Sequence, residues 1–168
     1  MASSPTNHEP PPRRSNRRPR LDETVYGPSG YAVHVVTDTK SQAPLFQDPE
    51  LAQQVLNILR EVAGQYGITL HCACIMPEHV HLVVSVNADG KPIPQFIKLF
   101  KARVAWHLRA QLPKEPWQRS FFDRVVRRSE DLRSFCLYVL QNPQEAGLVQ
   151  DWREYRFSWL LPELGSKA

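Results

Sequence analysis

Two histidines separated by a single residue, His79 and His81, are the side chains whose types and spacing most directly suggest chemistry. They open the run HVHLVV at residues 79–84, whose β-branched and apolar composition predicts a strand. Successive strand side chains point to opposite faces, so both imidazoles would share one face, with Cα atoms about 7 Å apart. Both rings could then bind one divalent cation, Mg²⁺ or Mn²⁺, with phosphate oxygens and water completing its shell. The alternative is a pair of solvent-exposed histidines that bind nothing.

Two cysteines in the preceding strand-like run, Cys72 and Cys74, offer a rival use of the same histidines. A two-residue turn would join the two runs in a hairpin and place Cys74 opposite His79. Two thiolates and two imidazoles together form a ligand set for a structural zinc ion. Four ligands on neighbouring strands would crowd one flat face, which argues against this arrangement.

Tyr138 is the candidate nucleophile. The apolar residues around it recur at positions i, i+3, i+4 and i+7, which predicts a helix with a buried stripe made of Leu132, Phe135, Cys136 and Val139. Tyr138 falls roughly 100° from this stripe, at its border, so its phenol can reach a polar surface. A phenol attacks phosphorus when a metal polarises the phosphate and stabilises the leaving oxygen. The alternative is an ordinary border tyrosine with its ring packed and its hydroxyl in solvent.

Asn142 follows Tyr138 by four residues and therefore projects on nearly the same side of the helix. Its amide oxygen is a candidate third ligand for a metal held by the histidines. Residues 142–145 (NPQE) also predict the start of a short helix, with Asn142 as its cap and Pro143 at its first position. Ligation and capping would compete for the same side chain.

Basic residues suggest a polyanionic partner, although the net charge of +4 is weak evidence by itself. Arginines cluster in a segment otherwise made of Pro, Ser and Asn, where they could lie along a phosphate backbone or simply solubilise the chain. The candidate phosphate contacts are Arg13, Arg14, Arg17 and Arg18 in this segment, Lys98, Lys101 and Arg103 on a later predicted helix, and Arg124, Arg127 and Arg128 near a later strand.

The elements that must position these residues follow in the order strand, helix, two strands, helix, strand, helix. The predicted strands are 31–37, 68–76, 79–86 and 121–127, and the predicted helices begin near Asp48, Pro94 and Ser129. This order predicts an α+β split βαβ fold, ferredoxin-like or RRM-like. It has an antiparallel sheet with helices on one face, the other face free for ligands, and an additional C-terminal helix that carries the tyrosine. His34, on the first strand, would line the same site or be packed.

The chain of 168 residues fits one domain, and we expect a disordered Arg/Pro-rich tail at 1–28, the domain at 29–160 and a C-terminal tail at 161–168. No apolar run approaches the roughly 18–20 residues of a membrane helix, and no secretion signal is evident. Three cysteines are too few for a disulfide framework. We therefore expect a cytoplasmic protein without a membrane partner.

Residues 76–84 (MPEHVHLVV) resemble the His-hydrophobic-His (HUH) motif of the single-tyrosine transposases. The later segments resemble the REP-associated tyrosine transposases of bacteria, and the similarity extends over roughly residues 26–159. These segments are Trp117, SFFD at 120–123, Arg127, YVLQNP at 138–143 and AGLV at 146–149. The ordered pairing of the histidine motif with Tyr-x-x-x-Asn-Pro is the most specific part of the resemblance.

The resemblance implies that His79, His81 and Asn142 bind Mg²⁺ or Mn²⁺ and that Tyr138 is the nucleophile. It further implies cleavage and rejoining of hairpin-containing single-stranded DNA through a 5′-phosphotyrosine intermediate, by a homodimer or a monomer. A non-catalytic module with an RRM-like sheet is the alternative, but such sheets read RNA through aromatics on their central strands, where this chain has histidines. A zinc-stabilised regulator is the third possibility.

Overall fold

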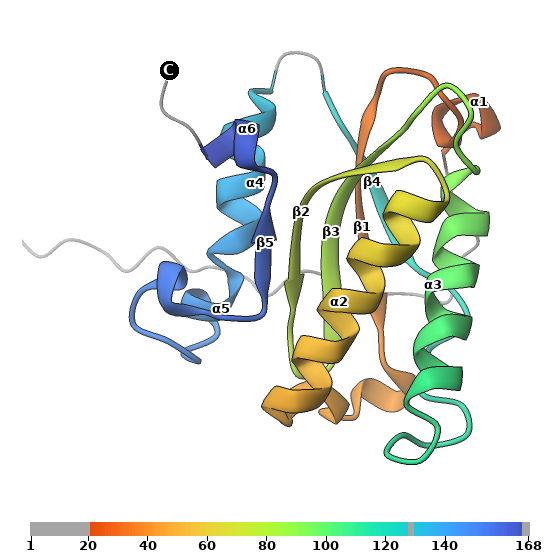
Figure 1. Ribbon diagram of the computed structural model, residues 1–168. Helices are drawn as coiled ribbons and strands as arrows, with labels where there is room; N and C mark the ends of the chain where they lie inside the picture. Colours follow the sequence, from red (N-terminus) through yellow and green to blue (C-terminus); the bar gives the residue numbers. More distant parts are fainter. Residues whose placement is uncertain (1–20, 128–129, 166–168) are drawn as a thin grey trace, which may run out of the picture.

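The computed structural model describes residues 21–127 and 130–165, and it contains a five-stranded sheet in the order β4-β1-β3-β2-β5 (Figure 1). Every neighbouring pair of strands is antiparallel. The strands are β1 (Ala32–Asp38), β2 (Ile68–Ile75), β3 (His79–Val86), β4 (Phe122–Val126) and β5 (Ser158–Leu160). The expected α+β fold with an antiparallel sheet is confirmed, and β5 is an edge strand that the sequence did not predict.

Two long helices, α2 (Pro49–Gln65) and α3 (Ile93–His107), cover one face of the sheet. Asp48 caps α2 by accepting a hydrogen bond from the backbone N–H of Glu50, and Pro49 stands in the first turn, where its missing N–H costs nothing. Alternate residues of β3, namely Val80, Leu82 and Val84, are fully buried in the core beneath these helices. The intervening residues of β3 therefore point to the opposite face.

The opposite face carries α4 (Leu132–Leu140), the helix with Tyr138 (Figure 1). A second apolar cluster attaches α4 to the sheet and consists of Cys72, Cys74, Met76, Val83, Val126, Phe135, Cys136, Val139 and Leu140. The expectation of a free second face is thus corrected, because α4 covers part of it. The short helices α5 (Asn142–Glu145) and α6 (Pro162–Gly165) follow α4 in the chain.

Three expected boundaries differ from the structure. Helix α4 begins at Leu132 with Asp131 as its cap, while the expected cap Ser129 lies outside the described residues. Residues 23–26 form helix α1 (Glu23–Tyr26), and the hydroxyl of buried Tyr26 donates to Asp123 at 2.6 Å, so the fold begins before residue 29. At the other end, the guanidinium of Arg133 donates to the carbonyl of Leu164 at 2.8 Å, so residues 161–165 of the expected C-terminal tail also pack on the domain.

Gly67, between α2 and β2, and Gly90, between β3 and α3, lie where the two connections touch. Gly67 has φ +67°, and its carbonyl accepts from the N–H of Asn87 at 2.9 Å. A Cβ atom on Gly90 would lie 2.2 Å from that same carbonyl oxygen, so only glycine fits there. Throughout the ranges 21–127 and 130–165, no helix has the length and apolarity needed to cross a membrane.

Candidate active site

His79 and His81 lie at the start of β3 and share the face that carries α4, as the strand alternation predicted. His81 is only 6% exposed and His79 is half-buried, which excludes the alternative of two freely exposed histidines. Their Nε2 atoms face each other at 2.9 Å. Two nitrogen lone pairs repel at this distance unless a proton or a cation lies between them.

This spacing also fits a metal ion. Two ligands at right angles in an octahedral shell, each about 2.1 Å from the metal, are about 3.0 Å apart. The observed 2.9 Å between the two Nε2 atoms matches that separation. Among the described residues, no group of three or more His, Cys, Asp or Glu side chains is placed to hold a metal. The imidazole pair would therefore need amide, phosphate or water oxygens to complete a shell.

The Nδ1 atoms of the two histidines also have partners. His79 Nδ1 lies 3.0 Å from Glu78 Oε1, and His81 Nδ1 lies 3.1 Å from His34 Nε2. The rings of His34 and His81 are stacked, with centroids 5.4 Å apart and an interplanar angle of 15°. Of the two expectations for His34, lining the site is the one that the structure supports.

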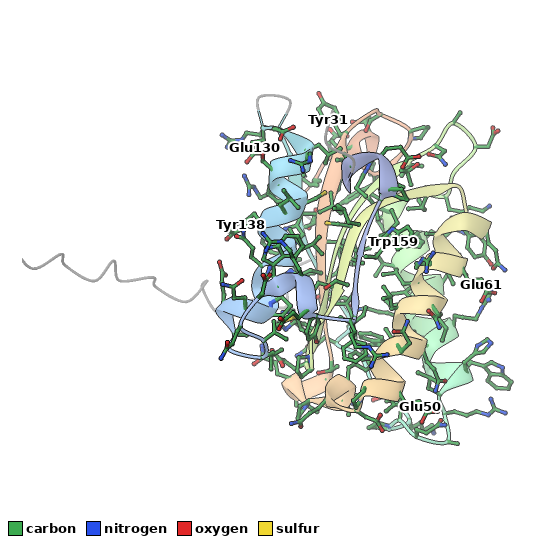
Figure 2. All side chains as sticks on the ribbon, turned by 60° about the vertical axis from the view of Figure 1, so that its left-hand side comes forward. Tyr31, Glu50, Glu61, Glu130, Tyr138 and Trp159 are labelled. Atoms are coloured by element: carbon green, nitrogen blue, oxygen red, sulfur yellow. The ribbon has the colours of Figure 1, made fainter. Side chains whose placement is uncertain are left out.

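A row of rings leads from the histidines to Tyr138. Phe135 of α4 packs edge-on against His34 of β1, with ring centroids 5.5 Å apart. The centroid of the Phe135 ring lies 6.3 Å from that of Tyr138 on the same helix. The Tyr138 side chain is 52% exposed, which confirms the expected border position of its phenol. Figure 2 shows Tyr138 on α4, on the side of the sheet away from Glu61 of α2. The histidine pair and the exposed phenol thus belong to one continuous set of packed rings in a single chain.

Asn142 does not cap a helix. It lies inside α5, whose cap is Gln141, and its side-chain Nδ2 donates to the carbonyl of Val139 at 2.6 Å. The capping prediction is wrong because α5 follows α4 without an extended residue between them, and a cap residue needs that extended conformation. The amide oxygen Oδ1 is left for other partners, and ligation by Asn142 remains a prediction.

The structure separates the predicted phosphate contacts. Lys101 is not one of them, because its ammonium donates to the carbonyls of Gln118 and Ser120 at 2.7 and 3.0 Å, and burial lowers its pKa to about 8. Lys98 is exposed, but its helix α3 lies on the face opposite the histidines. Arg127 is exposed at the end of β4. The four arginines Arg13, Arg14, Arg17 and Arg18 lie outside the described residues, as does Arg128.

Two residues of β4 lie on the same face as His81: Phe122, which was not singled out from the sequence, and Arg124, one of the predicted phosphate contacts. Phe122 is paired with Val36, which is paired in turn with His81, and the Phe122 ring is 47% exposed. Arg124 is paired with His34, and its guanidinium lies 5.2 Å from the centre of the Phe135 ring. It also bonds Glu130 at 2.6 Å. The alternation of residues 122–126 was the signal that could have identified Phe122.

The structure argues against a zinc site made of Cys72, Cys74, His79 and His81. Cys74 is paired with His81 rather than with His79, because Met76 and His79 close the hairpin. Cys72 and Cys74 are fully buried in the apolar cluster under α4. Burial raises the pKa of Cys74 to about 12, which disfavours the thiolate that zinc requires.

Comparison with known proteins identifies relatives. Residues 28–142, more than half of the chain, match the family described as IS200-like transposases. A REP-associated tyrosine transposase of Haemophilus influenzae is 24% identical over 114 residues, which cover 59% of this chain and 62% of that protein. The ISDra2 transposase TnpA of Deinococcus radiodurans is 34% identical over 65 residues, which cover 39% of this chain and 46% of that protein. The chain thus covers less than two thirds of either relative.

The fold has a match among solved structures. A REP-associated tyrosine transposase bound to a REP hairpin superimposes with a TM-score of 0.64 and 18% identity, covering 77% of this chain and 76% of the other. At this identity the likeness is one of fold. The family match over residues 28–142 carries the assignment, and it agrees with the resemblance of the histidine and tyrosine motifs. This protein belongs to the IS200-like transposase family.

Proposed function

We propose that this protein is a transposase that cleaves and rejoins single-stranded DNA, with Tyr138 as nucleophile. The observation that carries the proposal is the row of packed rings that connects His79 and His81 on the sheet to the exposed phenol of Tyr138 on α4. His79 and His81 would hold Mg²⁺ or Mn²⁺, with Asn142 as a third side chain, and the bound ion would supply polarisation of the scissile phosphate.

The chain's own residues supply the covalent step. The Tyr138 oxygen attacks phosphorus and loses its proton to solvent, while the bond from phosphorus to the 3′ oxygen breaks and that oxygen takes a proton. The product is a 5′-phosphotyrosine linkage and a free 3′-hydroxyl, and the step conserves the energy of the phosphodiester bond. A second 3′-hydroxyl then attacks the linkage, which restores the DNA strand and releases the phenol.

The substrate that we propose is hairpin-containing single-stranded DNA. One fold relative was solved with a REP hairpin, which motivates the hairpin. On this chain, the exposed Phe122 ring offers a stacking surface for an unpaired base beside the histidines, and Arg124 offers a cation on the same face. The central strands β1 and β3 present histidines instead of stacking aromatics on this face, which favours the enzyme over an RRM-like binding module.

The test is covalent capture of a hairpin strand labelled at its 3′ end, so that the fragment attached through its 5′ phosphate carries the label. With Mn²⁺, the full chain should give a labelled adduct that resists SDS, and Tyr138→Phe should give none. Tyr66→Phe is the matched control, because Tyr66 lies at the C-terminal end of α2 and packs against the large core, away from the histidine face, and it should give the wild-type amount. An adduct in Tyr138→Phe, or DNA binding without any adduct in the wild type, would overturn the proposal.

The metal requirement is tested separately with His79→Ala. His79 is the first residue of β3 and is only half-buried, so the variant should fold, lose the adduct and keep most of its DNA affinity, since phosphate contacts supply most of that affinity. Chelation of divalent ions should have the same effect. Full adduct formation in chelator would remove the metal from the mechanism, and an equal loss of cleavage and binding would make the histidine structural.

We further propose that the site is complete within one chain, because α4 packs on the face of the sheet that carries the histidines of the same chain. Mixing His79→Ala with Tyr138→Phe distinguishes this from a shared site. If a dimer combined histidines of one protomer with the tyrosine of the other, the mixed dimer would regain one intact site and form an adduct. A site within one chain predicts that the mixture stays inactive.

A further inference from the structure

Both candidate metal-binding histidines have a partner on the ring nitrogen that faces away from the proposed metal. Glu78 Oε1 lies 3.0 Å from His79 Nδ1, and His34 Nε2 lies 3.1 Å from His81 Nδ1. We propose that Glu78 and His34 are positioning residues that hold His79 and His81 in the Nδ1–H tautomer when a divalent cation is bound. This inference rests on the proposed function.

For His79 the tautomer follows from the chemistry of its partner. An ionised carboxylate only accepts hydrogen bonds, so His79 Nδ1 must donate to Glu78 and carry a proton. In the neutral ring the other nitrogen, Nε2, then has a free lone pair. That is the atom that faces His81. A carboxylate behind a metal-binding imidazole is a recurring arrangement, because it fixes the ring and raises its basicity.

The position of Glu78 is itself fixed by the end of β1. The N–H of Thr39 donates to the Glu78 carbonyl at 2.9 Å, and the Thr39 hydroxyl lies 2.9 Å from the same carbonyl and 2.7 Å from the carbonyl of Ala43. Thr39 is completely buried, so these bonds are shielded from water. The backbone of the turn that carries Glu78 is therefore anchored to the core, with the Glu78 carboxylate 3.0 Å from the His79 ring.

For His81 the partner is another imidazole, which can donate or accept. Without a cation, a proton on His81 Nε2 would lie between the two facing Nε2 atoms, and His34 would donate to His81 Nδ1. When a cation takes that place, the His81 proton must move to Nδ1, and His34 Nε2 must become the acceptor. Each ring keeps one proton throughout, so the exchange of proton for cation between the Nε2 atoms leaves all three rings neutral.

His34 can fulfil this role because two rings hold it in place. It stacks on His81, with an interplanar angle of 15°, and Phe135 of α4 packs edge-on against it at 5.5 Å. The orientation of a metal-binding ring on β3 therefore depends, through His34, on the packing of the helix that carries the nucleophile. A simple space-filling role would need the ring of His34 but not its acceptor nitrogen.

The tautomers can be observed directly by long-range ¹H–¹⁵N spectra of the full chain with and without Mg²⁺. We expect His79 as Nδ1–H in both states, and we expect His81 to change from Nε2–H to Nδ1–H on addition of Mg²⁺. A wild-type His79 in the Nε2–H form would overturn the inference. So would an unchanged His81 tautomer in protein that calorimetry shows to be saturated with Mg²⁺.

Metal affinity gives a second measurement. Glu78→Ala and His34→Leu should each raise the Kd for Mn²⁺ by about 10- to 100-fold, the usual effect of removing an outer partner. His34→Gln should recover part of the loss, because its amide oxygen can accept from His81 Nδ1. The matched controls are Glu154→Ala and His107→Leu, two exposed side chains on other elements, and both should bind as the wild type does. If His34→Leu does not fold, Glu78→Ala, which keeps the backbone hydrogen bond between Thr39 and residue 78, still carries the test.

The outcomes separate this inference from the proposed function. A wild type that binds Mn²⁺ and forms the adduct, with Glu78→Ala binding Mn²⁺ equally well, would refute the positioning roles alone. A wild type that neither binds Mn²⁺ nor forms an adduct would refute the proposed function and this inference with it.

Discussion

Replacing Phe135 with leucine should weaken the packing of α4 on the sheet and slow the proposed cleavage reaction. The Phe135 ring contacts His34 edge-on at 5.5 Å, lies 6.3 Å from Tyr138, and has the Arg124 guanidinium 5.2 Å from its centre. An aromatic pair contributes about 0.5–1.5 kcal/mol beyond burial, and a cation over a ring about 0.5–1 kcal/mol at a partly exposed site. Leucine keeps most of the apolar area and loses these contacts, so we expect a loss of about 2 kcal/mol in the free energy of unfolding.

Urea unfolding measures this loss, and thermal unfolding should show a decrease in Tm of about 4–8 °C for a chain of this length. A double-mutant cycle of Phe135→Leu with His34→Leu should give a coupling of about 0.5–1.5 kcal/mol, because the two rings touch. At equal folded fraction, the rate of adduct formation should fall at least about tenfold, since small displacements of a nucleophile are costly. Phe100→Leu, in the core under α2 and α3, should destabilise without this effect. Equal rates for wild type and Phe135→Leu would refute the reasoning.

Three other changes probe separate parts of the molecule. Phe122→Ala should weaken binding of single-stranded DNA about 5- to 150-fold, the value of one stacked base, with little change in stability, and unchanged affinity in an anisotropy titration would remove this ring from the DNA interface. Gly90→Ala should lower the free energy of unfolding by at least about 2 kcal/mol, because its Cβ would lie 2.2 Å from the Gly67 carbonyl oxygen. Gly64→Ala has open space around its Cβ and should leave the stability unchanged or raise it. Equal urea midpoints for the two variants would contradict this prediction. Burial raises the pKa of Cys74 to about 12, so the contribution of the neutral thiol to the free energy of unfolding is complete below the ordinary thiol pKa near 9 and is lost as the pH rises toward 12. Over this pH range, the free energy of unfolding of Cys74→Ala should decline less than that of the wild type. Parallel declines would show that the thiol ionises as readily in the folded state as in the unfolded state.

The histidine strand β3 and the tyrosine helix α4 could be predicted from the sequence, because each has a local periodic pattern. Alternation along residues 79–86 placed His79 and His81 on one face, and the helical repeat around residue 138 left the phenol at the border of the buried stripe. Neither inference needed knowledge of any distant part of the chain. The order of strands and helices gave the fold class for the same reason.

What the sequence could not supply was the set of contacts between distant residues. Nothing in the local pattern indicates that Lys101 would donate to the carbonyls of Gln118 and Ser120, which lie well beyond its own helix. His34 is similar, because its role depends on a stacking contact across the β1–β3 pair and on Phe135 of α4. The three-residue β5 is too short for a periodic signal, and it exists because β2 offers it an edge.

One face of β3 packs in the large core, and the other carries the histidines. On one face Val80, Leu82 and Val84 bind the strand into the large core under α2 and α3, which fixes the backbone of the histidines on the other. The tyrosine helix instead depends on a smaller cluster in which three buried cysteines and a methionine provide much of the packing. Because a small core stabilises less than a large one, α4 should shift more readily than the sheet. A rigid sheet that carries the histidines, with Tyr138 on a less tightly held helix above it, suits the proposed reaction, in which the tyrosine would carry the DNA between cleavage and rejoining.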